Sequence, residues 1–240
     1  GCFIASDVPA ILKYTRKVYY VDNQEVVRLR ADHMHFYTVD EEEIKKEAVT
    51  IEWDANAAEK AGYEHFMLKE MYEQPKTVAD TLSPRIKDND IVIEELNMTD
   101  DDLRAIKKIH IVACGSAYHA GVTGKYVIEG LARIPVEVDL ASEFRYRDPI
   151  LEEGAMVVVI SQSGETADTL AALRYANENR IKNIAVVNVF GSSLAREANC
   201  AIYTMAGPEI SVASTKAYSV QCAVLYVFAI HLAKINSSYK

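Results

Sequence analysis

The sequence of 240 residues predicts an α/β protein with a five-stranded parallel sheet flanked by helices. Three observations predict this class. From about residue 105, short apolar runs alternate with stretches of helical periodicity, as they do in βα units. The run 156–160 is continuously apolar, which is typical of a strand covered on both faces. The segment 214–235 is long and apolar nearly all round, which is typical of a core helix.

Five short apolar runs are the expected strands of the sheet: 108–113, 136–140, 155–160, 183–188 and 200–204. Four stretches with apolar residues at helical spacing are the expected helices: 117–132, 167–179, 193–197 and 214–235. Ligands of parallel sheets bind beyond the carboxyl ends of the strands. The loops 114–117, 161–166 and 205–215 are therefore the expected walls of a binding site.

The first fifty-odd residues are β-rich. Runs of β-branched and aromatic residues predict four strands, at 17–21, 25–30, 36–39 and 49–53. The polar residues 22–24 between the first two runs predict a hairpin. The piece 1–53 is therefore expected to be separate in character from the parallel sheet that follows.

Residues 54–104 are expected to connect these two parts. A polar, Ala-rich stretch over 54–62 is typical of a linker. An amphipathic helix follows over 63–74, and Pro75 is expected to end or restart it because proline cannot donate a helical hydrogen bond. Thr99 is expected to cap a short helix over 100–103.

The loop 161–166 is the most informative stretch of the chain, because it joins a buried strand to the start of a helix. Helix N-termini present free N–H groups and a partial positive charge, which suit a phosphate. Ser161, Ser163 and Thr166 add hydroxyl donors, and Gly164 lets the backbone approach a ligand closely. The loop contains no Lys or Arg, so it is not a nucleotide P-loop and favours a small phosphate ester. An ordinary helix cap at Ser163 or Thr166 explains the same residues equally well.

The composition excludes several classes of protein. The formal net charge of −9 leaves no basic surface for nucleic acid as a main partner. The longest apolar candidate for a membrane span, 222–235, is too short and contains His231 and Lys234. The four cysteines form no disulfide or metal pattern, so we expect free thiols, no metal and a cytoplasmic location. Both ends of the chain look cut from a longer protein.

Several motifs, in order along the chain, resemble one family. Residues 112–121, 161–166 and 212–217 closely resemble the first sugar-isomerase (SIS) domain of the glutamine–fructose-6-phosphate aminotransferase family, the glucosamine-6-phosphate synthases. The stretch 64–75 resembles the segment that enters that domain, and 3–7 resembles the later half of the family's glutaminase domain. Because the resemblance is collinear over essentially the whole chain, it is more specific than any single motif.

The resemblance implies a fold and a division of the chain. It implies the C-terminal part of an Ntn-type glutaminase domain over 1–53, a linker with entry helices over 54–104, and a flavodoxin-like SIS domain over 105–240. The family makes glucosamine 6-phosphate and glutamate from fructose 6-phosphate and glutamine. Its sugar-ring acid–base residues lie in a second SIS domain and a C-terminal tail. We therefore expect no catalytic residue and no cofactor in this chain, and Cys2 behind Gly1 is not the glutaminase nucleophile.

The resemblance also implies the binding residues. The phosphate is implied to be held by Ser161, Gln162, Ser163 and Thr166, the sugar to lie near Ser116, and the pocket to be lined by Val212 and Ser214. The family usually has Gly-Thr-Ser where this chain has Gly115-Ser116-Ala117, so one sugar-contacting hydroxyl is missing at Ala117.

Two other functions stay open from the sequence. One is a non-catalytic SIS module that senses a sugar phosphate, and the other is a stand-alone phosphosugar isomerase. The acidic, β-rich segment upstream counts against both, because such sensors carry a helix-turn-helix in that place and a stand-alone isomerase does not need the segment. The expected partners are fructose 6-phosphate or glucosamine 6-phosphate, a second copy of the chain in a homodimer, and the second SIS domain. The homodimer is expected because the apolar helix 214–235 needs cover on more than one face.

Overall fold

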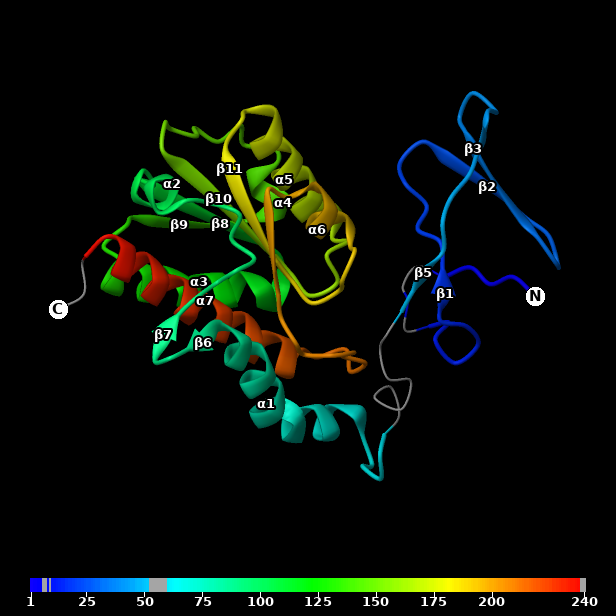
Figure 1. The fold of residues 1–240 in the computed structure, drawn as a ribbon, viewed down its shortest axis with the longest axis horizontal. Coiled ribbons are helices and arrows are strands. Elements are labelled where there is room, and N and C mark those ends of the chain that lie inside the picture. The colour runs from blue at the N-terminus through cyan, green and yellow to red at the C-terminus, as the bar shows by residue number, and fades with distance from the viewer. Residues whose placement is uncertain (6–7, 9, 52–59, 238–240) are drawn as a thin grey trace. The chain divides into compact units, whose positions relative to one another are not determined.

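The computed structural model describes residues 1–5, 8, 10–51 and 60–237, and the chain divides into two compact units (Figure 1). The units are 1–62 and 63–240. The boundary falls at the end of the linker expected over 54–62, and most of that linker lies outside the described residues. The end of the strand expected over 49–53 lies outside them as well.

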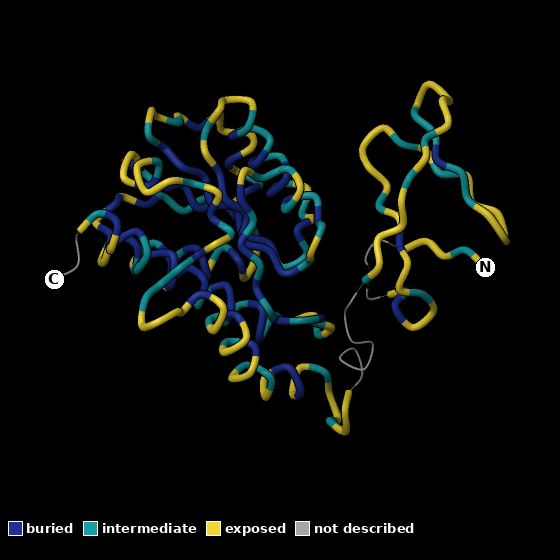
Figure 2. The backbone as a smooth tube through the Cα atoms, viewed as in Figure 1, coloured by how far each residue is buried: buried dark blue, intermediate teal, exposed yellow. Residues whose placement is uncertain are grey.

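The N-terminal unit holds two small antiparallel sheets. Its strands are β1 (Lys17–Val18), β2 (Glu25–Leu29), β3 (Met34–Thr38), β4 (Glu43–Ile44) and β5 (Val49–Thr50). β1 pairs with β5, whereas β2 pairs with β3 and β3 pairs with β4. Figure 2 shows that this unit is mostly exposed or half-buried.

The expected pairing of 17–21 with 25–30 is therefore wrong. β2 pairs instead with β3, and the register places Val26 opposite Tyr37 and Val27 opposite Phe36. Pairs of a β-branched and an aromatic side chain stabilise neighbouring strands, which favours this partner. The turn at 22–24 is still present, because the backbone N–H of Asp22 donates to Glu25 Oε2 at 2.7 Å.

The C-terminal unit is the expected α/β layer structure. Its parallel sheet has the order β12-β11-β10-β8-β9. The strands are β8 (Lys108–Ala113), β9 (Val136–Leu140), β10 (Ala155–Ser161), β11 (Lys182–Val187) and β12 (Cys200–Tyr203). Every residue of β10 is buried, as its apolar run predicts.

Helices cover both faces of this sheet, and each face has its own apolar core. The helices are α1 (Phe66–Leu82), α2 (Asp100–Arg104), α3 (Gly115–Leu131), α4 (Ala141–Phe144), α5 (Ala167–Glu178), α6 (Ser193–Glu197) and α7 (Lys216–Ile235), with a 3₁₀ turn η2 (Ser83–Arg85) and a small hairpin of β6 (Ile86–Lys87) and β7 (Asp90–Ile91). Residues of α3 and α7 share one core, and residues of α4, α5 and α6 share the other. Thr99 caps α2 as expected, with Asp102 completing a capping box.

The helix α1 runs through Pro75 without a break, so the expected interruption there is wrong. Proline cannot donate to the carbonyl one turn before it, which here belongs to Met71. The side chain of Gln74 supplies the missing donor, because its Nε2 lies 3.2 Å from the Met71 carbonyl oxygen. Packing of α1 against α7 adds to this compensation, and the helix continues to Leu82.

The helix α7 is the central helix of its layer. It packs against α3 on one side and α1 on another, as Figure 1 shows. The helix is long enough, and its mean hydropathy of 1.4 is high enough, for a membrane span. However, 61% of the 18-residue stretch with this hydropathy is buried inside the protein. The helix α1 supplies part of the cover that the second face of α7 needs.

Candidate functional site

The loop after β10 folds around the hydroxyl of Ser161. Ser161 is the last residue of β10 and is buried. Its Oγ lies 3.0 Å from Thr166 Oγ1 and accepts the backbone N–H of Gly164 at 3.1 Å. The hydroxyls at the two ends of the loop are thus joined, which turns the chain through a tight arc before α5 begins.

The loop is not explained by an ordinary helix cap. Thr166 occupies the N-cap position of α5, but its side chain makes no capping hydrogen bond. The Oγ of Ser163 accepts the N–H of Glu165 at 3.2 Å, which lies before the helix begins. The first N–H groups of a helix have no intrahelical acceptor. In the described structure, the hydroxyls of Ser163 and Thr166 leave those groups of α5 to a ligand, and an anion is the ligand they favour.

Gly164 fixes the loop against α6. Its φ is +70°, and a Cβ atom there would lie 2.1 Å from Ser192 Oγ. Its carbonyl oxygen accepts the N–H of Leu194 at 3.0 Å, and Glu165 Oε1 accepts the N–H of Ser193 at 2.8 Å. The absence of a side chain at Gly164 is therefore required by both backbone conformation and space.

Two acidic residues, Glu165 in the loop and Asp168 just after it, would repel an anion unless they were neutralised or turned away. Asp168 lies in the first turn of α5. Arg145 Nη1 donates to Asp168 Oδ1 at 2.7 Å, and this hydrogen bond raises the pKa of the Arg145 guanidinium. The ion pair offsets the negative charge of Asp168 close to the helix N-terminus.

The loop after β8 leaves the same edge of the sheet. β8 and β10 are adjacent and parallel, and Ala113 is opposite Ile160. Gly115 begins α3 with φ of +57°, and Ser116 is exposed in its first turn. Ala117 is buried in the apolar core, so the position where the family has a second hydroxyl here contributes a methyl group to packing.

Asn188 connects the loop after β10 to the segment after β12. Its backbone N–H donates to the Gln162 carbonyl oxygen at 3.2 Å, and its Nδ2 donates to the Gly207 carbonyl oxygen at 2.7 Å. Its Oδ1 accepts the N–H of Ala206 at 3.0 Å and the hydroxyl of Thr204 at 3.1 Å. Sequence reasoning placed this residue in a strand and missed it, because its partners lie in two other loops.

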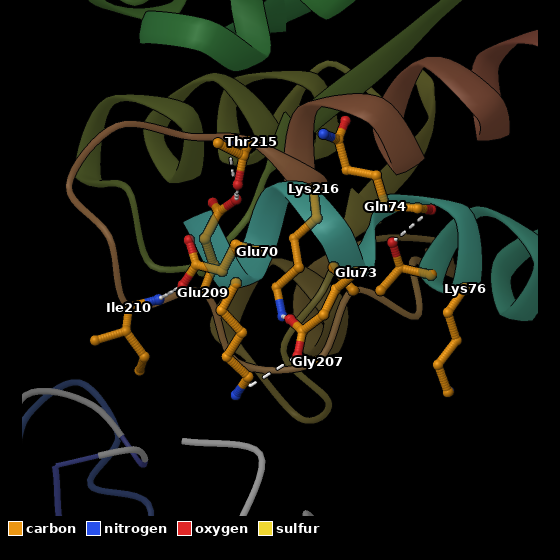
Figure 3. A network of polar contacts seen from close by, with 12 residues as sticks. Glu70, Glu73, Gln74, Lys76, Gly207, Glu209, Ile210, Thr215 and Lys216 are labelled. Atoms are coloured by element: carbon orange, nitrogen blue, oxygen red, sulfur yellow. Dashed lines mark hydrogen bonds and ion pairs between the residues drawn. The ribbon is translucent and has the colours of Figure 1, made fainter. Parts of the chain in front are cut away.

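The segment 207–215 is held by carboxylates, as Figure 3 shows. Glu209 Oε1 accepts the N–H groups of Thr215 and Ala217, at 2.9 and 3.1 Å, and thereby caps α7. Glu209 Oε2 accepts the hydroxyl of Ser214 at 3.2 Å. Val212 is fully exposed at the outermost point of the segment. Ser214 and Val212 thus lie on a loop whose ends are fixed.

Lys216 has a specific partner, which the sequence left undecided. It is buried, and its Nζ lies 2.7 Å from Glu73 Oε2 on α1. Sequence reasoning missed the contribution of α1 to this segment altogether. The sequence around Glu70 and Glu73 does not indicate these contacts, because the partners of both residues lie about 140 residues away in the sequence.

A second cluster of polar residues lies on strands β8 and β9. One ligand atom each from His110, Glu137 and Asp139 lies within 4.8 Å of the others. Both carboxylates are already paired, because Arg147 Nη2 lies 2.9 Å from Glu137 and 2.6 Å from Asp139. Lys108 Nζ lies 2.8 Å from Glu137 as well. The cluster is therefore an ion-pair network in the structure as described.

A cavity beside this network lies at the other end of the sheet from the three loops. It has a volume of about 560 Å³ and borders Lys108 and Val136, the first residues of β8 and β9, and the middle of α3. Parallel sheets bind ligands at the carboxyl ends of their strands. We therefore take the loops 114–117, 161–166 and 205–215 as the candidate site, and not this cavity.

Comparisons with known proteins identify the family of the C-terminal unit. The family model described as "SIS domain" matches residues 102–231. The chain is 58% identical over 235 residues to glutamine–fructose-6-phosphate aminotransferase from Clostridium acetobutylicum, covering 98% of this chain and 39% of that protein. It is 57% identical over 232 residues to the enzyme of the same name from Caldanaerobacter subterraneus, covering 96% of this chain and 38% of that protein.

A solved structure is similar to the C-terminal unit. It is the C-terminal domain of glucosamine-fructose-6-phosphate aminotransferase from Francisella tularensis, at 44% identity and a TM-score of 0.73. The match covers 76% of this chain and 52% of that one. The chain thus spans about two-fifths of the length of the sequence relatives it matches.

Proposed function

Because this chain belongs to the SIS domain family, we propose that it binds a sugar phosphate at the three loops, with the phosphate on 161–166. The main support for the proposal is that the N-terminus of α5 has no side-chain cap. The hydroxyls of Ser163 and Thr166 make no capping bond with the helix in the described structure, and its first N–H groups are open to an anion. The hydroxyls of the loop and the free N–H groups of the helix suit a phosphate monoester, and the carboxylate of Glu165 is turned to the N–H of Ser193.

The sugar is fructose 6-phosphate or glucosamine 6-phosphate in this proposal. Support comes from the relatives, which carry the name glutamine–fructose-6-phosphate aminotransferase and match nearly the whole chain. Gln162 lies on the loop after β10 and Ser116 lies in the first turn of α3, so both follow neighbouring strands at one edge of the sheet. Val212 and Ser214 lie on the segment that Asn188 joins to the first of these loops.

The same relatives suggest what part this chain plays in a whole enzyme. We expect the full protein to form glucosamine 6-phosphate and glutamate from fructose 6-phosphate and glutamine in the cytoplasm. This chain would supply the phosphate-binding SIS domain, and the sugar-ring acid–base groups would come from elsewhere in the protein. The purified chain should then bind fructose 6-phosphate without forming glucosamine 6-phosphate, even when ammonia is supplied. Measurable turnover would favour a stand-alone isomerase or a complete active site here.

Calorimetry with two variants tests the binding site. Removing a hydrogen bond to a charged group costs roughly 1.5–3 kcal/mol. Ser163→Ala and Thr166→Ala should therefore weaken fructose 6-phosphate binding by about ten- to a hundredfold. Fructose without the phosphate should not bind measurably.

The matched control is Ser83→Ala, which removes an exposed hydroxyl at the end of α1. Its affinity for fructose 6-phosphate should equal that of the unchanged chain. Unchanged affinity in both loop variants would show that the phosphate is bound elsewhere.

A further inference from the structure

The helix α1 buries its polar face. Its buried residues are Lys69, Glu70, Thr77 and Thr81. Its apolar residues Met67 and Met71 are, by contrast, close to half exposed. An amphipathic helix ordinarily turns its apolar side to the core, since burying a charged group is costly. The inverted orientation indicates that the polar face of α1 has a task that offsets this cost.

Glu70 holds the segment that carries Val212 and Ser214. It is 2% exposed, and its Oε1 accepts the N–H groups of Ile210 and Ser211 at 2.6 and 3.1 Å (Figure 3). Its Oε2 accepts the hydroxyl of Ser211. Three hydrogen bonds from two consecutive residues thus converge on one carboxylate. Such charge-assisted bonds are stronger than those between neutral groups.

Glu73, three positions further along α1, holds the other end of the segment. Its Oε2 lies 2.7 Å from the Nζ of Lys216, the first residue of α7, and its Oε1 lies 3.5 Å from the Nζ of Lys69. The two buried lysines thus lie near Glu73, whereas the carboxylate of Glu70 is satisfied by the three hydrogen bonds from Ile210 and Ser211. Buried charged groups are tolerated when they are paired or hydrogen-bonded in this way.

The two glutamates fix the segment on both sides of its outermost residues. Glu70 binds residues 210–211 and Glu73 binds residue 216, so that Val212 and Ser214 stand between two anchors. The loop 161–166 is held differently, by α6 and by the backbone of Asn188. Glu70 and Glu73 thus support only the segment 210–216, whereas Asn188 contacts both halves of the candidate site.

We propose that Glu70 is a positioning residue for the sugar end of the site. It orders the segment 209–214 before the ligand arrives, so that binding does not carry the entropic cost of ordering it. This inference rests on the proposed function, and it adds that sugar affinity and phosphate affinity depend on different residues. Glu70 affects sugar binding through Val212 and Ser214, whereas the loop 161–166 binds the phosphate.

The experiment compares two ligands, inorganic phosphate and fructose 6-phosphate, in NMR titrations of the whole chain. In Glu70→Ala, affinity for fructose 6-phosphate should fall by about tenfold, while affinity for inorganic phosphate should stay within about twofold. Glu70→Gln keeps an acceptor oxygen and nearly the same shape, and should recover part of the loss. If Glu70 had a merely structural role, its substitution would lower the affinity for both ligands together.

Two further variants keep the inference falsifiable. Ser211→Ala removes one hydrogen bond to Glu70 without leaving a buried cavity, and should show a smaller loss of the same kind even if Glu70→Ala fails to fold. Asp80→Asn on the same helix removes an exposed ion pair with Lys76 and should change neither affinity.

Two outcomes would overturn the inference. One is unchanged fructose 6-phosphate affinity in both Glu70→Ala and Ser211→Ala, and the other is an equal loss for both ligands. Failure of the unchanged chain to bind fructose 6-phosphate would instead overturn the proposed function on which the inference rests. The two failures are therefore distinguishable.

Discussion

The side-chain amide of Asn188 donates a hydrogen bond to the carbonyl oxygen of Gly207 at 2.7 Å. The backbone N–H of Asn188 donates to the carbonyl oxygen of Gln162. One buried residue therefore joins the loop after β10 to the segment after β12. Buried amides are costly when they lose their partners. The two loops therefore depend on Asn188 for their relative position.

Asn188→Ala should destabilise the protein, because it leaves the carbonyl of Gly207 and the N–H of Ala206 without their partner. A loss on the order of 1–3 kcal/mol is expected for unsatisfied buried groups. Chemical unfolding monitored by circular dichroism gives the measurement. Asn179→Ala is the control, because its amide also donates to a carbonyl, that of Tyr175, but at an exposed position. An equal loss in the two variants would contradict the role assigned to Asn188.

Gly164→Ala should abolish phosphate binding and lower stability. The new Cβ would meet Ser192 at 2.1 Å from Oγ and 2.5 Å from Cβ, on a backbone with φ of +70°. Since the Cβ contact remains, Ser192→Ala should not rescue the variant. Gly130→Ala is the control, because its helical site has open space. Replacing a helical glycine with alanine should stabilise by roughly 0.5–1 kcal/mol. Normal ligand affinity in Gly164→Ala would refute the geometry of the loop.

Stability should fall as the pH drops below about 6.5, and His110 should contribute to the fall. Burial lowers the pKa of the His110 imidazole, with Lys108 adding to the effect. The surrounding charged groups are Lys108, Glu137, Asp139 and Arg147. Because the folded pKa lies below the unfolded one, the unfolded chain binds more protons in the interval between them. The free energy of unfolding therefore decreases as the pH falls through that interval.

The measurement is urea unfolding at a series of pH values. His110→Gln should flatten the pH dependence, whereas His65→Gln should leave it unchanged because His65 is exposed. A pH profile of His110→Gln that matches that of the unchanged chain would show that His110 does not contribute.

The chain should associate with a partner through α1. The apolar helix α7 is partly covered by α1, and most of the large apolar side chains that stay exposed on these two helices belong to α1. Met67, Met71 and Tyr72 are 43%, 48% and 68% exposed. Light scattering at micromolar concentration should report a dimer or a larger species, and Met71→Lys should shift it toward the monomer. A monomer before and after this substitution would contradict the expectation.

The parallel sheet and the site loops were predictable from the sequence because their signals are local. A continuous apolar run such as 156–160 predicts a buried strand, and the helical spacing of 167–179 predicts the helix after it. The carboxyl ends of parallel strands meet at one edge, so the loops 114–117 and 161–166 were expected to be neighbours. The pairing of β8 with β10 confirms this part of the expectation.

A few features had a local signal that was not used. Asp88 and Asn89, with φ of 51° and 62°, form the two-residue turn between β6 and β7. Aspartate and asparagine favour such left-handed turns, so this hairpin could have been predicted.

Other features were decided only by the tertiary structure. The hydrophobic pattern of α1 indicates an apolar core face, yet the fold buries Glu70 and exposes Met71. β2 pairs with β3 and not with the first strand, and the helix α1 continues through Pro75 because Gln74 replaces a lost donor. Glu70 and Ile210 are 140 residues apart, and a hydrogen bond at that separation leaves no periodicity in the sequence. Local patterns report which surfaces a segment must bury, whereas the partner of a buried charge is fixed only when distant segments meet.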